Sequence, residues 1–381
     1  MNVVEKTKKC VGCGACVDKC AVNALSLQKD KNGFLVASID NSRCVDCGLC
    51  LKVCPSLEKT EKNDFEEKYY CGTFNNNEVR TKSSSGGFFS AIADYVLKQN
   101  GVVYGAKYDN EYTAVLMDST DNVDIDELRR SKYSQGNPNG MYKSIAENLK
   151  QDRLCLVVGT PCQIDAARKS FGNNQNLILV DFVCGGVTPQ TVFENYTKSL
   201  KEKYKSKIIS LNFRDKKYGW KVPNISVKFE NGKEYHSPYQ FDKYYYYFYS
   251  THYLKNLPCL SCDFKNHYAA DITLGDFWGY KSANIEVDNN GISMALIHSE
   301  HGNEIFGKIS DVLSLKTLEK SQIEYCFKKK QYSEKMLKDR EAFLAKVEKY
   351  GFVKTAEKEY FKYGKLGVNI KRITKRIKKF L

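Results

Sequence analysis

No stretch of the 381-residue sequence approaches the ~18 consecutive apolar residues of a membrane-spanning helix. The first residues, MNVVEKTKKC, contain neither the apolar segment nor the small-residue cleavage site of a secretory signal. No helicase, nuclease or glycosylase motif is present either. We therefore expect a cytoplasmic protein, and these absences argue against a nucleic-acid repair enzyme.

Cysteine is abundant by contrast. Fifteen cysteines in a chain without a secretory signal predict metal or redox chemistry rather than a disulfide framework. The formal net charge of +14 would favour a nucleic-acid partner, but it counts every cysteine as neutral. Cysteines that bind metal do so as thiolates, and anionic cofactors would lower the charge further. The loaded protein would then be only mildly basic, so we expect no nucleic-acid partner.

Eight cysteines near the N-terminus form two copies of the spacing C-x2-C-x2-C-x3-C. They are Cys10, Cys13, Cys16 and Cys20, and then Cys44, Cys47, Cys50 and Cys54. In two-cluster ferredoxins the fourth cysteine of each run ligates the other cluster. We therefore predict one 4Fe–4S cluster on Cys10, Cys13, Cys16 and Cys54, and a second on Cys20, Cys44, Cys47 and Cys50. Paired zinc sites are the alternative, but zinc modules arrange their four ligands as two pairs.

The chain divides into a small N-terminal domain, a linker and a longer region with alternating strand and helix patterns. Residues 1–57 read as a bacterial-ferredoxin-like domain whose segment 25–40 predicts two short strands around a Lys31-Asn32-Gly33 turn. Residues 58–68 are charged and read as an exposed linker. Beyond it we expect a helix from Phe88 to about Gln99 and a strand over residues 102–108. Residues 153–169 predict a strand, a turn at Gly159-Thr160-Pro161-Cys162 and a helix, and residues 177–189 predict a further strand that ends in Cys184-Gly185-Gly186. The strand–helix–strand order predicts a parallel α/β arrangement, followed by a strand and a helix over residues 291–306.

Cys259 and Cys262 have C-x-x-C spacing, but two thiolates are too few ligands for a zinc ion or an iron–sulfur cluster. They either form a redox disulfide or take two more ligands from elsewhere. Cys162 and Cys184 follow predicted parallel strands on glycine-bearing turns, where open α/β sheets gather ligands. These two thiols can complete a four-thiolate site. We interpret Cys71, Cys155 and Cys326 as structural.

Two segments have phosphate-binding character but no dinucleotide fingerprint. The Ser83–Gly87 run opens the helix at Phe88, so its N–H groups can seat a phosphate or merely cap the helix. LRRSKYSQG (128–136) is either a solvated basic loop or a loop that grips an anionic cofactor or substrate. G-x-G-x-x-G is absent from both.

Six separated motifs occur in an order that resembles the beta subunits of coenzyme F420 hydrogenases and dehydrogenases. They are SSSGGFFSAIADYVL, RSKYSQG, GTPCQIDAAR, VDFVCGGVTP, NFRDKKYGW and LPCLSCDFKNHYAADITLGDFWG. The resemblance covers about residues 69–300, and the ferredoxin-like domain matches the version of the family with two additional clusters. It implies an FAD-dependent iron–sulfur oxidoreductase with a third 4Fe–4S cluster, acting on coenzyme F420 or another small acceptor. The domain-fused, lysine-rich sequence looks most like members found with polysaccharide biosynthesis and pyruvyl transferase genes.

The resemblance also assigns residues. It implies cluster ligands at Cys162, Cys184, Cys259 and Cys262. Flavin contacts are implied at Ser85, Gly86, Gly87, Ser131, Lys132, Tyr133, Gly159 and Thr160. Arg214, Lys217 and Asp276 are the candidates for catalysis, with Trp220 beside them, while Trp220 and Trp278 could equally be core residues. The aromatic stretch 241–256 is expected to pack around the third cluster, with His252 and His267 structural.

The expected organisation is an α+β ferredoxin-like domain followed by a mixed α/β flavoprotein unit. This unit divides into residues 69–150 and residues 151–310, the latter with the third cluster and the flavin. Residues 311–381 are expected to be a helical, basic tail. Its last turns place Leu366, Ile370 and Ile373 on one face among lysines and arginines, which suits a peripheral membrane contact or a tail docked on the protein. Partners would be a redox donor or acceptor protein or a small-molecule substrate. The alternative function is a non-catalytic ferredoxin-type electron-transfer subunit serving a separate reductase.

Overall fold

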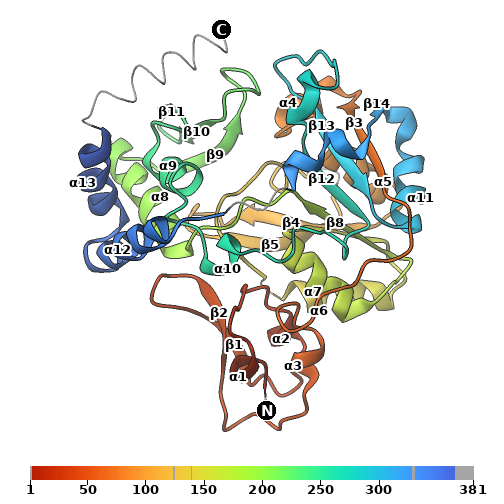
Figure 1. The fold of residues 1–381 in the computed structure, drawn as a ribbon, viewed down its shortest axis with the longest axis horizontal. Coiled ribbons are helices and arrows are strands. Elements are labelled where there is room, and N and C mark those ends of the chain that lie inside the picture. The colour runs from red at the N-terminus through yellow and green to blue at the C-terminus, as the bar shows by residue number, and fades with distance from the viewer. Residues whose placement is uncertain (1, 123–124, 139, 328–330, 365–381) are drawn as a thin grey trace.

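The computed structural model describes residues 2–122, 125–138, 140–327 and 331–364, and the fold has three parts. A small N-terminal module projects from the base of the molecule (Figure 1). A large mixed sheet with helices on both faces forms the body. A lobe of helices and a small sheet stands beside it.

The N-terminal module is built from two short helix–cysteine segments and one hairpin. Its elements are α1 (Val3–Lys6), α2 (Ala15–Asp18), β1 (Leu25–Lys29), β2 (Leu35–Ile39) and α3 (Leu49–Lys52). The strands pair antiparallel, with Gly33 at φ +83° in their turn, which confirms the predicted hairpin. Helices α2 and α3 each follow a left-handed glycine, so the two cysteine runs adopt matching conformations.

The body is a nine-stranded sheet in the order β14-β3-β13-β12-β8-β7-β4-β5-β6. The strands are β3 (Lys68–Phe74), β4 (Val102–Tyr108), β5 (Val115–Thr120), β6 (Gly136–Asn137), β7 (Cys155–Gly159), β8 (Leu177–Phe182), β12 (Ile272–Asp276), β13 (Ser293–Ile297) and β14 (Leu313–Thr317). Its centre, β12-β8-β7-β4, is parallel, as the strand–helix–strand pattern predicted. The carboxyl ends of these four strands therefore meet at one edge.

Helices cover both faces of this sheet, which is why its central strands read as continuous apolar runs. They are α4 (Asn77–Lys82), α5 (Phe88–Lys98), α6 (Met141–Lys150), α7 (Pro161–Phe171) and α11 (Glu300–Lys308). Leu177 and Leu179 of β8 pack on the side of α6 and α7, whereas Ile178 and Val180 pack on the side of α5 and α11. All four are fully buried.

The side lobe joins residues far apart in the chain. It contains α8 (Gln190–Tyr204), the antiparallel strands β9 (Ile208–Asp215), β10 (Asn224–Phe229) and β11 (Glu234–Pro238), α9 (Lys243–Tyr249), α12 (Glu334–Tyr350) and α13 (Phe352–Gly364). Tyr244 of α9 packs against Phe193 of α8, Phe213 of β9 and Phe352 of α13. The aromatic stretch thus fills the core of this lobe, and the prediction that it packs around the third cysteine set is wrong for α9. Its tyrosines lie between helices and strands of the lobe instead.

One expected boundary is also wrong. Residues 69–150 and 151–310, expected as two parts of one unit, contribute strands to the same sheet. The expected helical tail begins with a strand, because β14 pairs with β3 at the edge of that sheet. The linker over residues 58–68 is largely exposed as predicted, although Thr60 and Glu58 are tied to Asp165 and Lys169 of α7.

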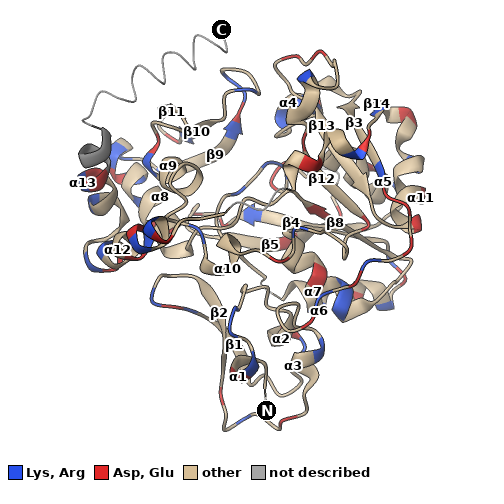
Figure 2. Ribbon diagram, viewed as in Figure 1, with Lys and Arg blue, Asp and Glu red and all other residues tan. Residues whose placement is uncertain are grey.

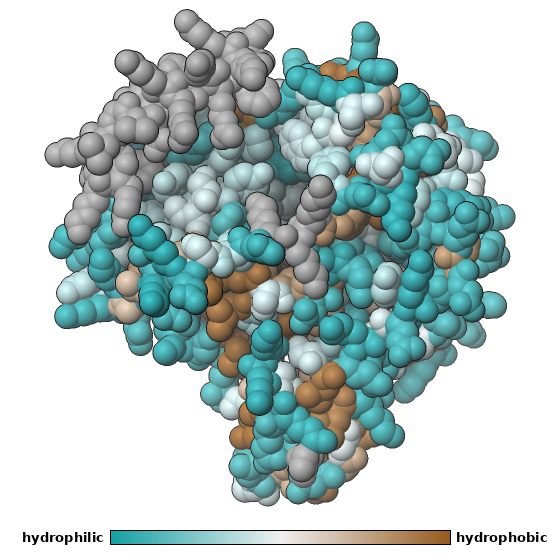
Figure 3. Space-filling model, viewed as in Figure 1, coloured by the Kyte–Doolittle hydropathy of each residue, from teal (hydrophilic) through white to brown (hydrophobic). Residues whose placement is uncertain are grey.

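Charge and hydropathy vary over the surface without a single pattern. Figure 2 shows basic and acidic residues interspersed along the ribbon. Figure 3 shows hydrophobic residues at the surface of the projecting module, where Val22 and Val45 are exposed. No helix in the described part of the chain is long and apolar enough to cross a membrane. The basic face containing Leu366, Ile370 and Ile373 lies outside the described residues.

Candidate functional site: three cysteine sets and a polar centre

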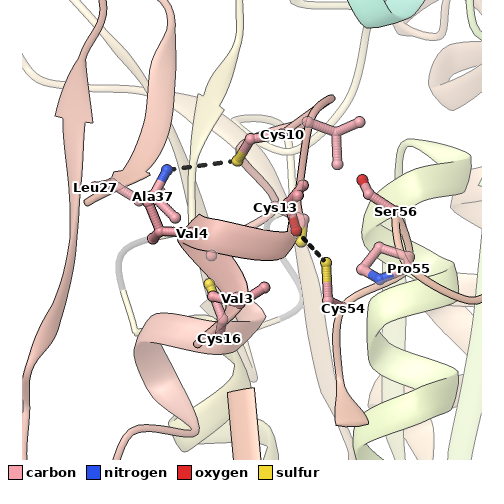
Figure 4. A pocket seen from close by; sticks show the side chains of 13 residues that line it. Val3, Val4, Cys10, Cys13, Cys16, Leu27, Ala37, Cys54, Pro55 and Ser56 are labelled. Carbon is pink, nitrogen blue, oxygen red and sulfur yellow. Dashed lines mark hydrogen bonds between the residues drawn. The ribbon is translucent and has the colours of Figure 1, made fainter. Parts of the chain in front are cut away.

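The first set of thiols surrounds a cavity inside the N-terminal module. Cys10, Cys13, Cys16 and Cys54, here called the inner set, line it together with Val3, Val4 and Leu27 (Figure 4). The Ala37 N–H donates to Cys10 Sγ at 3.4 Å, and Thr7 Oγ1 lies 3.6 Å from Cys54 Sγ. An apolar cavity with thiols on its wall and hydrogen bonds to sulfur fits a cubane cluster, whose sulfurs accept such bonds. The four residues are those that the crossed pairing predicted.

The second set surrounds a neighbouring cavity. Cys20, Cys44, Cys47 and Cys50, here called the outer set, line it with Val22, Leu25 and Ile39. The Ala24 N–H donates to Cys20 Sγ at 3.3 Å. Cys47 is exposed, whereas Cys13 and Cys16 of the inner set are buried. The two sites therefore differ in their access to solvent.

The third set lies at the carboxyl edge of the parallel strands. Cys162 stands in the first turn of α7 directly after β7, Cys184 follows β8, and Cys259 belongs to the short helix α10 (Leu257–Leu260), with Cys262 just beyond. Gly186, at φ +101°, allows this approach, since a Cβ there would lie 3.1 Å from Cys259 Cβ. Its N–H donates to Cys184 Sγ at 3.4 Å. The fold thus brings together the four thiols that the resemblance assigned to one cluster.

Burial and mutual repulsion disfavour thiolates in this set. Burial raises the pKa of Cys162 well above its usual value, and Cys184, Cys259 and Cys262 raise it further. The same causes, burial first, raise the pKa of Cys184 to about 12 and that of Cys259 to about 11. Positive iron would remove this penalty, because cluster ligands bind as thiolates.

The other three cysteines lie apart from these sets. Cys71 in β3 and Cys155 in β7 are fully buried strand residues, in agreement with a structural role. Cys326 is half-buried and ends a single 3-10 turn, η4 (Glu324–Cys326), inside the region that was expected to be a helical tail. His267 is buried and its Nδ1 lies 2.6 Å from Asp181 Oδ2, which also fits a structural residue.

A polar centre lies at the carboxyl end of β12. Arg214 and Asp276 form a two-point ion pair with Nη1–Oδ2 and Nη2–Oδ1 distances of 2.7 and 3.0 Å. Trp220 Nε1 donates to the same Oδ1 at 2.8 Å. Burial disfavours the charge of Arg214, but Asp276 outweighs it and holds the Arg214 pKa above its usual value. Both residues are among the catalytic candidates named from the sequence, and the structure shows that they contact each other.

Two tryptophans flank the polar centre. Trp220 is buried, and Trp278 stacks on it with ring centroids 4.1 Å apart. Trp278 opens the 3-10 turn η1 (Trp278–Lys281) and is 40% exposed. One tryptophan is therefore a core residue and the other presents an accessible aromatic face beside Asp276.

The predicted phosphate-binding segments converge on this centre. Arg214 Nη2 donates to the Ser84 carbonyl at 3.4 Å, and the Ser131 N–H donates to Ser84 Oγ at 3.2 Å. Ser85 Oγ donates to the Ile292 carbonyl at 2.7 Å, and Gly87, at φ +97°, caps α5. Gly86 lies against Gly72 and Ser293 without room for a side chain. Ser85 and Gly86 therefore have structural contacts in addition to the predicted role.

Gly159 and Thr160 occupy a different place. Gly159 ends β7, and Thr160 caps α7 through reciprocal hydrogen bonds with Gln163. Thr160 Oγ1 also lies 3.2 Å from Cys162 Sγ. The structure therefore places this pair beside the third set, so Thr160 contacts a cluster-ligand candidate directly.

Two half-buried lysines have lowered pKa values, Lys216 beside the polar centre and Lys132 in the neighbouring loop over the Tyr108 ring, and the sequence identified only Lys132. Burial, together with Arg130, lowers the pKa of Lys132 to about 7. Burial, together with Arg80 and Arg214, lowers that of Lys216 to about 7 as well. Lys132 donates to the carbonyls of Arg129 and Arg130, and Lys216 to those of Arg80, Ser85 and Asn290. No described carboxylate forms an ion pair with either lysine, which suits an anionic ligand.

Lys217, the predicted catalytic candidate, is exposed, whereas its neighbour Lys216 points into the centre. Adjacent lysines at the end of a strand face opposite sides, so the sequence could have identified Lys216 only from the strand register of β9. Tyr133 stacks among Phe213, Tyr245 and Phe248, and its carbonyl accepts from Thr188 and Tyr244. Tyr133 is thus tied to the side lobe.

Comparison with known proteins agrees with these sites. Residues 152–322 match the family model that describes the C terminus of the coenzyme F420 hydrogenase/dehydrogenase beta subunit. Residues 9–57 match the model of a 4Fe-4S dicluster domain. No curated protein matches the chain.

One solved structure is similar in part. It is a chain from a xenon-derivatized F420-reducing [NiFe] hydrogenase complex of Methanosarcina barkeri. The match covers 81% of this chain and 97% of that chain, with 18% identity and a TM-score of 0.45, values too low to support an argument. The two family matches stand without it: residues 9–57 are similar to a 4Fe–4S dicluster domain, and residues 152–322 are similar to the C-terminal region of the coenzyme F420 hydrogenase/dehydrogenase beta subunit, which together indicate an iron–sulfur protein of electron transfer.

Proposed function

We propose that this protein is an FAD-dependent iron–sulfur oxidoreductase with three 4Fe–4S clusters, one on each cysteine set. The observation that carries the proposal is the shared location of the third set and the polar centre. Both lie where the parallel strands end, with Cys162 after β7, Cys184 after β8 and Asp276 at the end of β12. Open α/β sheets bind cofactors at such edges.

The polar centre has the groups that a flavin dinucleotide requires. Lys132 and Lys216 supply half-buried positive charge for a pyrophosphate, and the Ser84–Ser131 contact holds their loops together. The exposed face of Trp278 offers an apolar surface for a ring. Arg214, fixed by Asp276, can stabilise negative charge on a reduced ring. Bound FAD would take electrons singly from the clusters and deliver them in pairs, as hydride, to an organic substrate.

The substrate would be coenzyme F420 or another small acceptor, and a redox protein would supply electrons through the ferredoxin module. A role in polysaccharide biosynthesis rests on the sequence resemblance alone. Peripheral membrane contact rests on the basic C-terminal residues alone. The competing function is a non-catalytic electron-transfer subunit, which would need the clusters but no flavin.

Anaerobic reconstitution tests the proposal. We expect about twelve irons per chain from three cubanes and one FAD, with flavin reduced by dithionite-treated protein in the absence of any partner. Protein with full iron that neither retains nor binds added FAD would favour the competing function. If FAD does bind, reduction of an F420 analogue by the isolated chain would identify the substrate class.

A further inference from the structure

The N-terminal module contacts the body through a buried glutamine. Gln135 is 3% exposed and lies just before β6 of the large sheet. Its Oε1 accepts from the Leu35 N–H at 2.7 Å, and its Nε2 donates to the carbonyls of Leu35 at 3.0 Å and Val11 at 3.3 Å. Leu35 begins β2, and Val11 lies between the inner-set ligands Cys10 and Cys13. One side chain therefore holds both the hairpin and the cysteine loop.

Gln135 is itself held firmly. Its backbone N–H donates to the Thr188 carbonyl at 3.0 Å, and its carbonyl accepts from Gln190 Nε2 at 3.2 Å. Three residues earlier the same loop contains Lys132, whose ammonium lies over the Tyr108 ring. A buried amide that satisfies three backbone groups of another module is costly to remove, because those groups would lose their partners.

Further contacts bring the inner set against the third set. Lys9 Nζ, next to Cys10, donates to Ser261 Oγ at 3.3 Å, and Ser261 lies between Cys259 and Cys262. The Tyr142 N–H donates to Asp18 Oδ2 at 3.0 Å. Gly14 packs on Pro138 so closely that a Cβ would lie 2.3 Å from Pro138 Cγ. The module is thus joined to the body at several points around the cysteines.

The Tyr142 side chain lies close to thiols of both sets. It is 4% exposed, and its hydroxyl donates to the Gln163 carbonyl at 3.3 Å in the first turns of α7. Burial raises the pKa of this hydroxyl, and Cys13 and Cys162 raise it further, so thiols of both sets lie near it. Burial raises the pKa of Cys13, and Cys162 is among the neighbouring thiols that raise it further. Figure 1 shows the same relationship at the level of the ribbon, with α2 directly below α6 and α7.

We propose that Gln135 is a positioning residue that locks the ferredoxin module onto the body, so that electrons pass from the inner set to the third set within one rigid unit. The module is then a fixed donor and not a swinging one, and Tyr142 excludes water from the gap. The electron lost at the inner site is the electron gained at the third site, so no further reactant is required. This inference rests on the proposed function only in placing clusters on both sets.

The test compares Gln135→Ala with Asn148→Ala, which removes a half-buried amide of α6 that bonds Tyr104 and Ser144 and does not contact the module. We expect Gln135→Ala to keep wild-type iron content but to weaken the magnetic interaction between the reduced inner and third clusters. Electron transfer between them after photoreduction should be slower than in the wild type, because a displaced module lengthens the distance that the electron must cross. The control variant, Asn148→Ala, should match the wild type in both the magnetic interaction and the rate of electron transfer.

A readout that does not depend on the clusters accompanies these measurements. Trypsin should cut the 58–68 segment, which contains Lys59 and Lys62, faster in Gln135→Ala than in either reference protein. The inference would be overturned if Gln135→Ala, with its full iron content, had the same magnetic interaction, transfer rate and proteolysis as the wild type. Failure of the proposed function is distinguishable, because full iron without bound FAD would overturn that function and leave this inference standing. Iron missing from the third set of the wild type would overturn both.

Tyr142 provides a second pair of variants. Tyr142→Phe keeps the ring and loses only the bond to Gln163, so electron transfer should stay within about twofold of wild type. Tyr142→Leu removes the ring and should slow transfer relative to Tyr142→Phe. Equal rates in the two variants would show that the ring has no positioning role.

Discussion

Arg214 and Asp276 form a two-point ion pair across 62 positions of sequence, and Trp220 donates to the same carboxylate. The arginine side chain is 9% exposed and the aspartate 17%. A buried guanidinium of this kind requires its carboxylate partner, because water cannot take the place of that carboxylate in compensating the charge. The pair therefore fixes β9 of the side lobe against β12 of the body.

Asp276→Asn should destabilise the protein by about 3–5 kcal/mol, the typical cost of leaving one partner of a buried pair uncompensated. Denaturant unfolding of the apoprotein measures this. Asp118→Asn is the matched control, since Asp118 pairs with Lys107 at 2.6 Å but both are about one third exposed. That change should cost no more than about 1 kcal/mol. Equal losses in the two variants would contradict a special role for the buried pair.

Cys259→Ser should remove about four irons per chain, the content of one cubane, and leave the inner and outer sites loaded. The physical reason is that Cys259 belongs to the third set alone. Cys155→Ala should keep all the iron, because Cys155 is a fully buried strand residue that belongs to none of the three sets. Iron analysis with electron paramagnetic resonance distinguishes these outcomes. An unchanged iron content in Cys259→Ser would restore the disulfide interpretation of the C-x-x-C pair.

Iron should leave the outer site before the other two. Cys47 is exposed, whereas Cys13, Cys16 and Cys54 of the inner set are buried. Treatment with a chelator under mild oxidation should therefore release about four irons in a fast phase and the remainder slowly. Cys47→Ser should lose the fast phase and keep the slow one. Release of all the iron in a single phase would show that exposure of Cys47 does not control access.

Flavin affinity should be highest below pH 7 and should weaken as the pH rises above it. The free protein has a Lys216 pKa of about 7, lowered by burial and by Arg80 and Arg214. An anionic ligand would raise this pKa, so above pH 7 binding must take up a proton, and below it the lysine is already charged in both states. Titrations of the flavin-free protein with FAD between pH 6 and 9 measure how the binding affinity changes with pH.

Lys216→Met should bind flavin more weakly and show a smaller slope. Lys217→Met is the control, because Lys217 is exposed and should leave the pH profile unchanged. A profile that is equally steep in Lys216→Met would assign the dependence to another group, with Lys132 the next to test.

The N-terminal module was predictable because its information is local. The doubled cysteine spacing, Gly33 and the alternation around it specify the hairpin and the crossed pairing of Cys20 and Cys54 without any distant contact. The parallel strands were also predictable, since β7 and β8 are continuous apolar runs separated by a helix of regular spacing. Cys162 and Cys184 then follow at the carboxyl edge from topology alone.

Contacts between distant segments were not predictable in the same way. Lys216 and Lys217 are equivalent in the sequence, and only the register of β9 turns one inward. The tyrosines of α9 could pack around any apolar centre, and they pack in the side lobe because α8, α12 and α13 close over them. Gln135 looks like an ordinary polar residue of a loop until β2 lies beside it.

The sequence by itself determined which residues can bind iron, because ligand spacing is a property of a short piece of chain. Tertiary structure decided how the sites relate to one another. Burial of Gln135, the Lys9–Ser261 contact and the Arg214–Asp276 pair each join residues more than 60 positions apart. Such pairs form only when the chain has folded and brought distant segments together, and no local sequence pattern records that event. For Gln135 and for Arg214–Asp276, packing also excludes water and strengthens the contact.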